Sequence, residues 1–213
     1  MRHEASPQQA PSALVSILFR ILTALNCGAI LLDENKRIIR LNDRAQNHLG
    51  EALATNKGRL CATDRGCDAL FQPILDQSLK YGERARDWRR EAIGLRREDK
   101  RPVIARVVSV GGEAHNLLDG AALVVILLDP EDCPDPSHAL LQQVFGLTRG
   151  EARLASQLSC GQSLQDIAEA SGVSVGTVRS QAKAVLTKTD THRQAELVAL
   201  LTRLAMISES DPR

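Results

Sequence analysis

Aromatic residues are scarce in this sequence. Its 213 residues include three phenylalanines, one tryptophan and one tyrosine, which together make up 2% of the chain. Pockets that hold flat-ring cofactors are lined mainly by apolar and aromatic side chains. The scarcity therefore argues against a bound flavin or haem, and we expect no cofactor.

The chain also lacks an excess of charge of one sign. Its 27 Lys and Arg residues nearly balance its 26 Asp and Glu residues, which leaves a formal net charge of +1. This balance argues against a protein that is coated by polyanions or broadly adsorbed to membranes. The five cysteines include no Cys-x-x-Cys pair, and their odd number does not indicate a disulfide framework. We therefore expect a cytoplasmic protein, because free thiols persist in a reducing compartment.

Catalytic and metal-binding patterns are missing as well. The sequence contains no Gly-rich phosphate loop, no acid cluster with a partnering lysine, and no nucleophile beside a base. Cys61 and Cys67 are too isolated from histidine to indicate a zinc site. We therefore expect neither an enzyme nor a metalloprotein.

The longest apolar stretch, residues 13–32, is interrupted by Arg20 and by Asn26-Cys27-Gly28. The arginine lies where a signal peptide or a membrane span needs an apolar core. We therefore predict a disordered lead-in over residues 1–11 and an amphipathic helix over residues 12–26, with no membrane segment. The helix repeats large apolar residues at heptad spacing, which suits packing on a neighbouring domain or on a second subunit: Leu14, Leu18, Ile21 and Leu25.

The sequence pattern of residues 27–129 is typical of strands separated by helices. Two strands are predicted first, over residues 28–33 and 37–41, and Asn42 then caps a short helix that Gly50 closes. The other predicted elements are a helix over residues 66–80, with Leu70, Ile74 and Leu79 among its buried residues, and strands over residues 88–95, 102–110 and 121–128.

This order of elements resembles a PAS domain, most closely in Leu32-Asp33 followed by Leu41-Asn42-x-x-Ala45. The resemblance implies that residues 27–129 sense a small-molecule ligand or pair with a second copy. PAS domains that use flavin photochemistry carry an Asn-Cys-Arg run, and Asn26-Cys27-Gly28 departs from it. His48 has polar neighbours, so we interpret it as a surface histidine rather than a haem ligand. The arginine-rich segment 83–101 is interpreted as a salt-bridged sheet face, with a second nucleic-acid or partner surface as the alternative.

Prolines 130, 134 and 136 mark an extended linker over residues 130–137. The second domain is expected over residues 138–213. It opens with a helix that includes His138–Phe145, in which Leu141, Val144 and Phe145 are predicted to be buried.

Four helix starts follow in close succession. Three of them place a hydroxyl N-cap three residues before a carboxylate or an amide, and Ser174 with Thr177 starts the remaining helix in a related way. The three pairs are Thr148 with Glu151, Ser163 with Asp166, and Thr191 with Gln194. Together with Gly161 and Gly172, which turn the chain after a helix, they predict helices over residues 148–160, 163–170, 174–189 and 191–206.

The second and third of these helices form a predicted helix-turn-helix. Ala168 leaves room for a close crossing, Gly172 makes the turn, and Val173 and Val178 are expected to fill the wedge between the helices. The third helix buries one apolar stripe and presents cations between short polar groups on its opposite face: Gly176, Arg179, Ser180, Lys183 and Thr187. Such a face fits the major groove of DNA.

Residues 147–201 resemble the DNA-binding domain of LuxR-type transcriptional regulators. The matching residues are Leu147-Thr148, Glu151, Gly161, Ile167-Ala168, Gly172-Val173-Ser174, Thr177-Val178-Arg179, Lys188 and Arg193. The resemblance implies base-facing positions for Arg179, Ser180 and Lys183. It implies positions near backbone phosphates for Thr177, Lys188 and Arg193, and a dimer contact through the last helix. Ser171 and Thr189 stand where the family usually has leucine.

The sequence thus predicts an α+β chain, in which a PAS-like antiparallel sheet with helices precedes an all-α four-helix helix-turn-helix domain. Its predicted function is that of a dimeric transcriptional regulator that binds double-stranded DNA under the control of the PAS-like domain. The alternatives are a protein-interaction or signalling adaptor that keeps the fold without DNA binding, and a sigma-factor-like promoter-recognition protein. The best support for an adaptor is the net charge of +1 from residue 137 onward, together with Ser171 and Thr189 in place of the leucines of the family.

Overall fold

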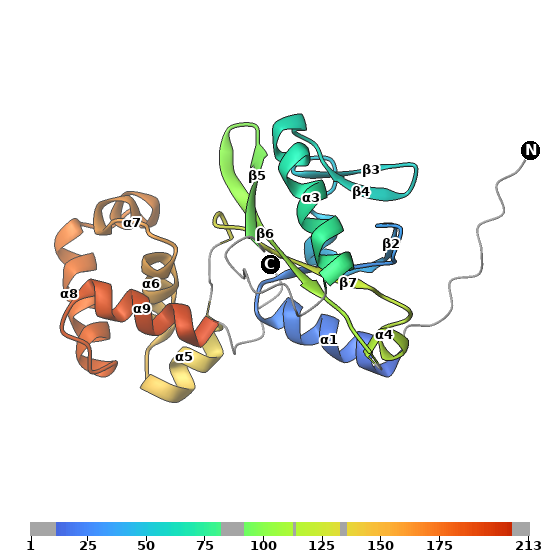
Figure 1. The fold of residues 1–213 in the computed structure, drawn as a ribbon. Helices are drawn as coiled ribbons and strands as arrows, with labels where there is room; N and C mark the ends of the chain where they lie inside the picture. The colour runs from blue at the N-terminus through green and yellow to red at the C-terminus, as the bar shows by residue number, and fades with distance from the viewer. Residues whose placement is uncertain (1–11, 82–91, 113, 133–135, 206–213) are drawn as a thin grey trace, which may run out of the picture. The chain divides into compact units, whose positions relative to one another are not determined.

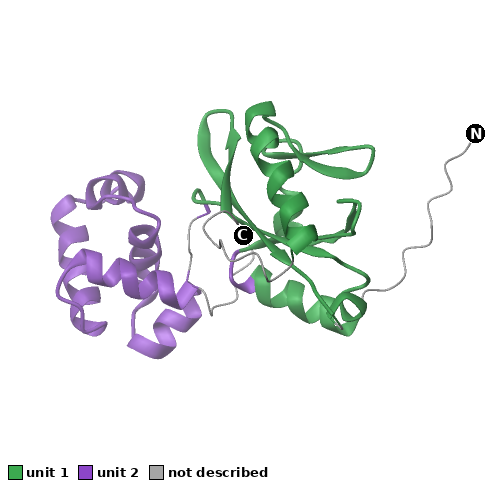
Figure 2. Cartoon of the chain, viewed as in Figure 1, with its two compact units in different colours: residues 1–23, 27–131 green, residues 24–26, 132–213 purple. Residues whose placement is uncertain are grey.

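The computed structural model describes residues 12–81, 92–112, 114–132 and 136–205. The chain divides into two compact units (Figure 2). Unit 1 comprises residues 1–23 and 27–131, and unit 2 comprises residues 24–26 and 132–213. Helices and an antiparallel sheet occur together, which confirms the α+β class. The predicted lead-in over residues 1–11 lies outside the described residues.

Unit 1 is built on a five-stranded antiparallel sheet with the order β2-β1-β7-β6-β5 (Figure 1). Its strands are β1 Gly28–Leu32, β2 Ile38–Leu41, β5 Ala92–Arg97, β6 Lys100–Ser109 and β7 Leu123–Leu128. A short helix, α4 Ala114–Leu117, precedes β7. All five predicted strands are present, although residues 88–91 of the third lie outside the described part of the chain.

Helices cover both faces of this sheet, and alternate residues of β1 therefore enter different cores. On one face, Ile30 and Leu32 pack with Phe71 of α3, which spans Arg65–Tyr81. On the other face, Leu31 packs with Val15 of α1, which spans Ala13–Ala24. The two cores explain why β1 is apolar and buried at every position.

The buried stripe of α3 differs from the predicted one. Cys67, Phe71 and Leu75 are buried, whereas Leu70 is 64% exposed, so the prediction that Leu70 is buried is wrong. Ile74 and Leu79 are partly buried against the core, as expected. The i, i+4, i+8 spacing of the buried residues shows that the helix faces the sheet with a stripe rotated away from Leu70.

Asn42 holds together the first elements of unit 1. It caps α2, Asp43–Gln46, because its Oδ1 atom accepts the N–H of Ala45 at 3.0 Å, and the same atom accepts the N–H of Ala29 on β1 at 2.8 Å. Its Nδ2 atom donates to Thr23 Oγ1 and to the carbonyl oxygen of Cys27, both at 3.0 Å. The predicted N-cap is therefore confirmed, and the side chain also ties α1 and β1 to this helix.

Gly28 allows α2 to lie directly against β1. A Cβ atom at this position would lie 3.1 Å from the Cα atom of Ala45 and 3.1 Å from the Cβ atom of Leu127. A larger residue would push the backbone of α2 away from the strand.

Besides the short helix α4, two further features of unit 1 were not predicted. A second hairpin pairs β3, Leu53–Asn56, with β4, Arg59–Ala62. Its two-residue turn is Lys57-Gly58, with φ angles of 52° and 80°. The second feature is His48, which is 6% exposed, so its interpretation as a surface histidine is wrong. Polar neighbours in sequence did not reveal that the turn after α2 faces inward.

Unit 2 consists of five described helices (Figure 1). They are α5 His138–Phe145, α6 Arg149–Ser159, α7 Leu164–Ser171, α8 Val175–Lys188 and α9 Gln194–Ala205, and all five were predicted. Capping boxes start α6 at Thr148 and α7 at Ser163, as expected. The Thr191–Gln194 cap is wrong, because the Thr191 hydroxyl lies 2.9 Å from that of Thr189 and the N–H of His192 donates to Glu196.

The core of unit 2 joins side chains from all five helices. Leu141 of α5 is buried, but Val144 is 54% exposed, so only part of the predicted stripe on this helix is correct. Cys160, which caps the C-terminus of α6, is disulfide-bonded, so the expectation of free thiols is wrong at this position, whereas Cys27, Cys61 and Cys67 form no disulfide. None of the helices in the described part of the chain has the length and apolar character needed to cross a bilayer.

Candidate nucleic-acid interface

A tight turn of three residues, Gly172-Val173-Ser174, joins α7 to α8. Gly172 has the left-handed φ angle of 66° and ends α7, while the Ser174 hydroxyl accepts the N–H of Thr177 at 3.1 Å and starts α8. Ala168 and Val178 are buried between the two helices, as predicted. Val173 is 43% exposed, so its predicted place in the wedge is wrong.

The outward face of α8 carries two cations one helical turn apart. Arg179 and Lys183 are exposed, and among the residues that the structure describes no carboxylate pairs with either of them. The hydroxyls beside them bond to the helix itself, since Ser180 donates to the carbonyl of Gly176 at 3.1 Å and Thr187 donates to that of Lys183 at 3.0 Å. Neither of these hydroxyls bonds to the Arg179 or Lys183 side chain, so both cations stay available to a ligand.

The buried face of α8 explains why the cations point outward. Val178, Ala182 and Val185 are buried in the core of unit 2, and Leu186 packs against that core. Residues on the opposite side of the helix must then face solvent, because side chains one or two positions apart do not share a face. The predicted apolar stripe of this helix is confirmed.

Of the other predicted site residues, Thr177 lies on α8 and Arg193 lies on the connection to α9. Thr177 is exposed in the first turn of α8, with its hydroxyl 2.9 Å from that of Ser174. Arg193 is exposed just before α9. The structure thus brings Thr177, Arg179, Ser180 and Lys183 together on α8, and places Arg193 on the connection that follows it.

Lys188 has a structural partner that the sequence did not reveal. Its Nζ atom lies 2.7 Å from the Glu151 carboxylate and donates to the carbonyl of Gly146 at 3.1 Å. The same Glu151 carboxylate accepts the N–H of Thr148 at 2.7 Å. The hydrogen bonds from Lys188 and Thr148 hold the pKa of Glu151 below its ordinary value. Lys188 therefore fastens the end of α8 to the start of α6, and a phosphate contact through its third N–H stays a proposal.

Replacing Glu151 by glutamine is expected to lower the free energy of unfolding of unit 2 by about 1 kcal/mol at pH 7. Because the folded-state pKa of Glu151 is lowered, its contribution is present above the unfolded-state pKa and is lost as the pH falls through the folded-state pKa. The difference between Glu151→Gln and wild type should therefore shrink from pH 7 to pH 4 in thermal unfolding. Glu169→Gln, which changes an exposed carboxylate on α7, is the control. Equal stability of the two variants at pH 7 would contradict this role.

Thr189 accounts for one departure from the leucine pattern. Its side chain is buried, and its hydroxyl donates to the carbonyl of Val185 at 2.8 Å. The polar group is satisfied inside the last turn of α8, so the smaller side chain does not leave an unpaired donor in the core. Ser171, at the other departure, is exposed.

The described residues contain no group of three or more His, Cys, Asp or Glu side chains that could hold a metal ion. What this face offers chemically is hydrogen-bond donors with positive charge on a rigid helix. That set suits guanine edges and phosphate oxygens.

No protein-family model matches the chain, and no curated protein matches it. Solved structures of VqmA proteins are similar to it over most of its length. A phage VqmA–DPO complex is 14% identical over 93% of this chain and 92% of that one, with a TM-score of 0.35. A Vibrio cholerae VqmA dimer without target DNA, studied as a LuxR-type receptor, is 15% identical over 90% and 92%, with a TM-score of 0.34. The Vibrio cholerae VqmA–ligand–DNA complex is 16% identical over 95% and 92%, with a TM-score of 0.35.

Proposed function

We propose that the protein is a transcriptional regulator that binds double-stranded DNA and inserts α8 into the major groove. The observation that carries the proposal is the exposed, unpaired Arg179–Lys183 face of this helix among the described residues. A helix of this length, Val175–Lys188, is about 21 Å long, and the major groove is wide enough to admit it. The tight α7–α8 turn supports a helix-turn-helix, in which the second helix reads the bases.

Within this proposal, each exposed residue has a distinct task. Arg179 and Lys183 donate to base edges with Ser180 between them, because all three lie in the middle of the outward face. Thr177, in the first turn of α8, and Arg193, on the connection to α9, contact backbone phosphates. Lys188 joins them only if its ammonium keeps one N–H free while it holds Glu151.

Unit 1 is proposed to act as a PAS-like sensory or dimerising domain. Support comes from its order of two strands, helices and three strands in one antiparallel sheet. Support for a homodimer comes from α1, where one face packs on the sheet and the other carries exposed apolar residues at three- and four-residue spacing. These residues are Leu14, Ile17 and Ile21, and the exposed Leu25 follows the helix. Leu18 of the predicted stripe packs instead against the core beneath α1, so the prediction is wrong at that position. A dimer would present two copies of α8 to half-sites about one duplex turn apart.

Selection of binding sites from random double-stranded DNA with the full chain tests the proposal. We expect an enriched sequence with two related halves whose centres lie about 10 base pairs apart. Affinity for it should fall as salt rises, with a slope set by the number of phosphates contacted. Failure to enrich any sequence, together with no salt-dependent retention on DNA, would favour the adaptor function instead.

A further inference from the structure

A buried ion pair lies where β7 ends and the chain leaves unit 1. The two guanidinium nitrogens Nη1 and Nη2 of Arg97 each lie 2.6 Å from a carboxylate oxygen of Asp129. The side chains are 3% and 8% exposed. Burial raises the pKa of Asp129, but the hydrogen bonds from Arg97 outweigh it and the pKa is lowered. Two-point pairing of this kind is both strong and directional.

The β5–β6 hairpin positions Arg97 so that its guanidinium group meets the Asp129 carboxylate. The pairing register of β5 and β6 shifts between Leu95 and Arg97, and such a shift redirects a side chain. Atoms Nε and Nη2 of Arg97 also donate to the carbonyl of Arg101, at 3.0 and 2.7 Å. The guanidinium therefore moves with the tip of the hairpin.

Asp129 in turn holds the first residues of the connection to unit 2. Its Oδ1 atom accepts the N–H of Glu131 at 2.9 Å, across Pro130. The N–H of Arg101 donates to the Glu131 carboxylate at 3.4 Å. Residues 129–131 are thus fastened to the same hairpin at two points.

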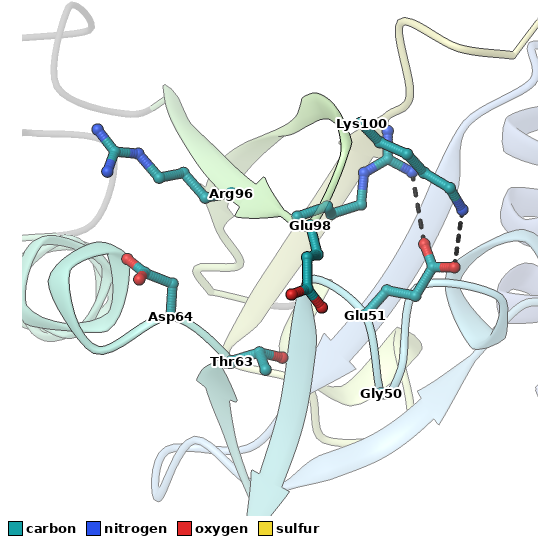
Figure 3. A pocket seen from close by; sticks show the side chains of 8 residues that line it. Gly50, Glu51, Thr63, Asp64, Arg96, Glu98 and Lys100 are labelled. Carbon is teal, nitrogen blue, oxygen red and sulfur yellow. Dashed lines mark hydrogen bonds and ion pairs between the residues drawn. The ribbon is translucent and has the colours of Figure 1, made fainter.

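Other groups surround the pair without replacing it. His48 lies 4.0 Å from Asp129, and its carbonyl accepts the N–H groups of Ala52 and Leu53. Glu51 lies 3.7 Å from Arg97 and pairs with Lys100 at 2.8 Å. Arg97, Glu51 and Lys100 also line an open pocket of about 570 Å³, in which Figure 3 shows the link between Glu51 and Lys100. A molecule in this pocket would touch the hairpin beside the pair.

We propose that the Arg97–Asp129 pair is a latch that couples the position of the β5–β6 hairpin to the segment joining the two units. β6 stays paired with β7 from Ile104 to Ser109, so only the tip of the hairpin, around Arg97 and Arg101, is free to shift. When this tip moves away from the end of β7, Arg97 leaves the carboxylate and residues 129–131 lose their attachment. The freedom of unit 2 to engage DNA then changes. Only this last step rests on the proposed function.

Digestion of the full chain with endoproteinase Glu-C tests the latch directly, because cleavage after Glu131 requires residues 129–131 to detach. The variant Asp129→Asn should be cut there about tenfold faster than wild type, the factor expected when one charge-assisted hydrogen bond is removed. The fragment ending at Glu131 is quantified by mass spectrometry. Arg97→Lys keeps the charge but loses the two-point geometry, and should be cut at an intermediate rate.

Asp119→Asn is the matched control, because Asp119 pairs with Arg40 at 2.9 Å elsewhere in unit 1. If it accelerates cleavage as much as Asp129→Asn, or if Asp129→Asn causes no acceleration, the latch is overturned. Faster cleavage with unchanged affinity for the selected DNA would overturn the coupling step. Failure of wild type to select DNA would remove the proposed function, while the cleavage rates would still decide the latch.

Discussion

Replacing Asn42 by alanine is expected to lower the free energy of unfolding of unit 1 by about 3 kcal/mol. Loss of an N-cap alone costs about 1 kcal/mol. Asn42 is 6% exposed and also bonds Ala29, Thr23 and Cys27. Its removal therefore leaves buried backbone groups outside the helix without a hydrogen-bond partner. Each group left without a partner adds about 1–3 kcal/mol to the loss of unfolding free energy before the structure relaxes. The total should therefore be well above the cost of a cap.

Urea unfolding followed by circular dichroism gives the free energy of unfolding for Asn42→Ala and wild type. Asp64→Ala is the control within the same unit, because Asp64 accepts the N–H of Cys67 at 2.8 Å and serves α3 as a local cap. Asn42→Asp separates the two kinds of bond, since it keeps the acceptor atom and loses the donors to Thr23 and Cys27. A loss for Asn42→Ala no larger than that for Asp64→Ala would show that the bonds to α1 and β1 contribute nothing.

Asn42 also illustrates what the sequence of unit 1 could and could not predict. A cap is a local pattern, so the start of α2 was predictable from Asn42 and the residues after it. The bonds to Ala29 and Thr23 join α2 to elements that come earlier in the chain, and no regular spacing of residues in the sequence predicts them. The burial of His48 was not predictable for the same reason, because its neighbour Asp129, at 4.0 Å, follows β7 and lies far along the chain. The β3–β4 hairpin does carry a local signal, Lys57-Gly58 between Leu53 and Leu60.

Prediction went further in unit 2, because its helices are short and their ends are chemically marked. Thr148, Ser163 and Ser174 fixed three helix starts, and the spacing of Val178, Ala182 and Val185 fixed which side of α8 is buried. The outward cations followed from that. The partner of Lys188 could not be predicted in this way, because Glu151 lies on another helix and its local pattern indicates only a capping role. The exposure of Val173 likewise depends on the exact path of the turn.

Replacing Arg179 by alanine is expected to weaken binding to the selected DNA by about 1–3 kcal/mol, which is roughly fivefold to more than a hundredfold. Arg179 is exposed and has no partner among the described residues, and alanine favours helix, so the variant should unfold at the wild-type temperature or above. Weaker binding then reports that Arg179 touches DNA, and not that the domain is damaged. Fluorescence anisotropy against the selected duplex and a scrambled one measures the effect.

The comparison between the two duplexes shows which part of the DNA Arg179 touches. If Arg179 binds a base edge, the alanine variant binds the selected duplex more weakly and the scrambled one nearly as wild type does. If Arg179 binds a phosphate, the variant binds both duplexes more weakly and the salt slope falls by about one. Arg153→Ala removes the same charge from an exposed position on α6, and so isolates the effect of net charge. Lys183, one turn further along the same face, should behave like Arg179. If both α8 variants bind as wild type does, the groove must be read by another surface, since no other exposed cations lie in the middle of this helix.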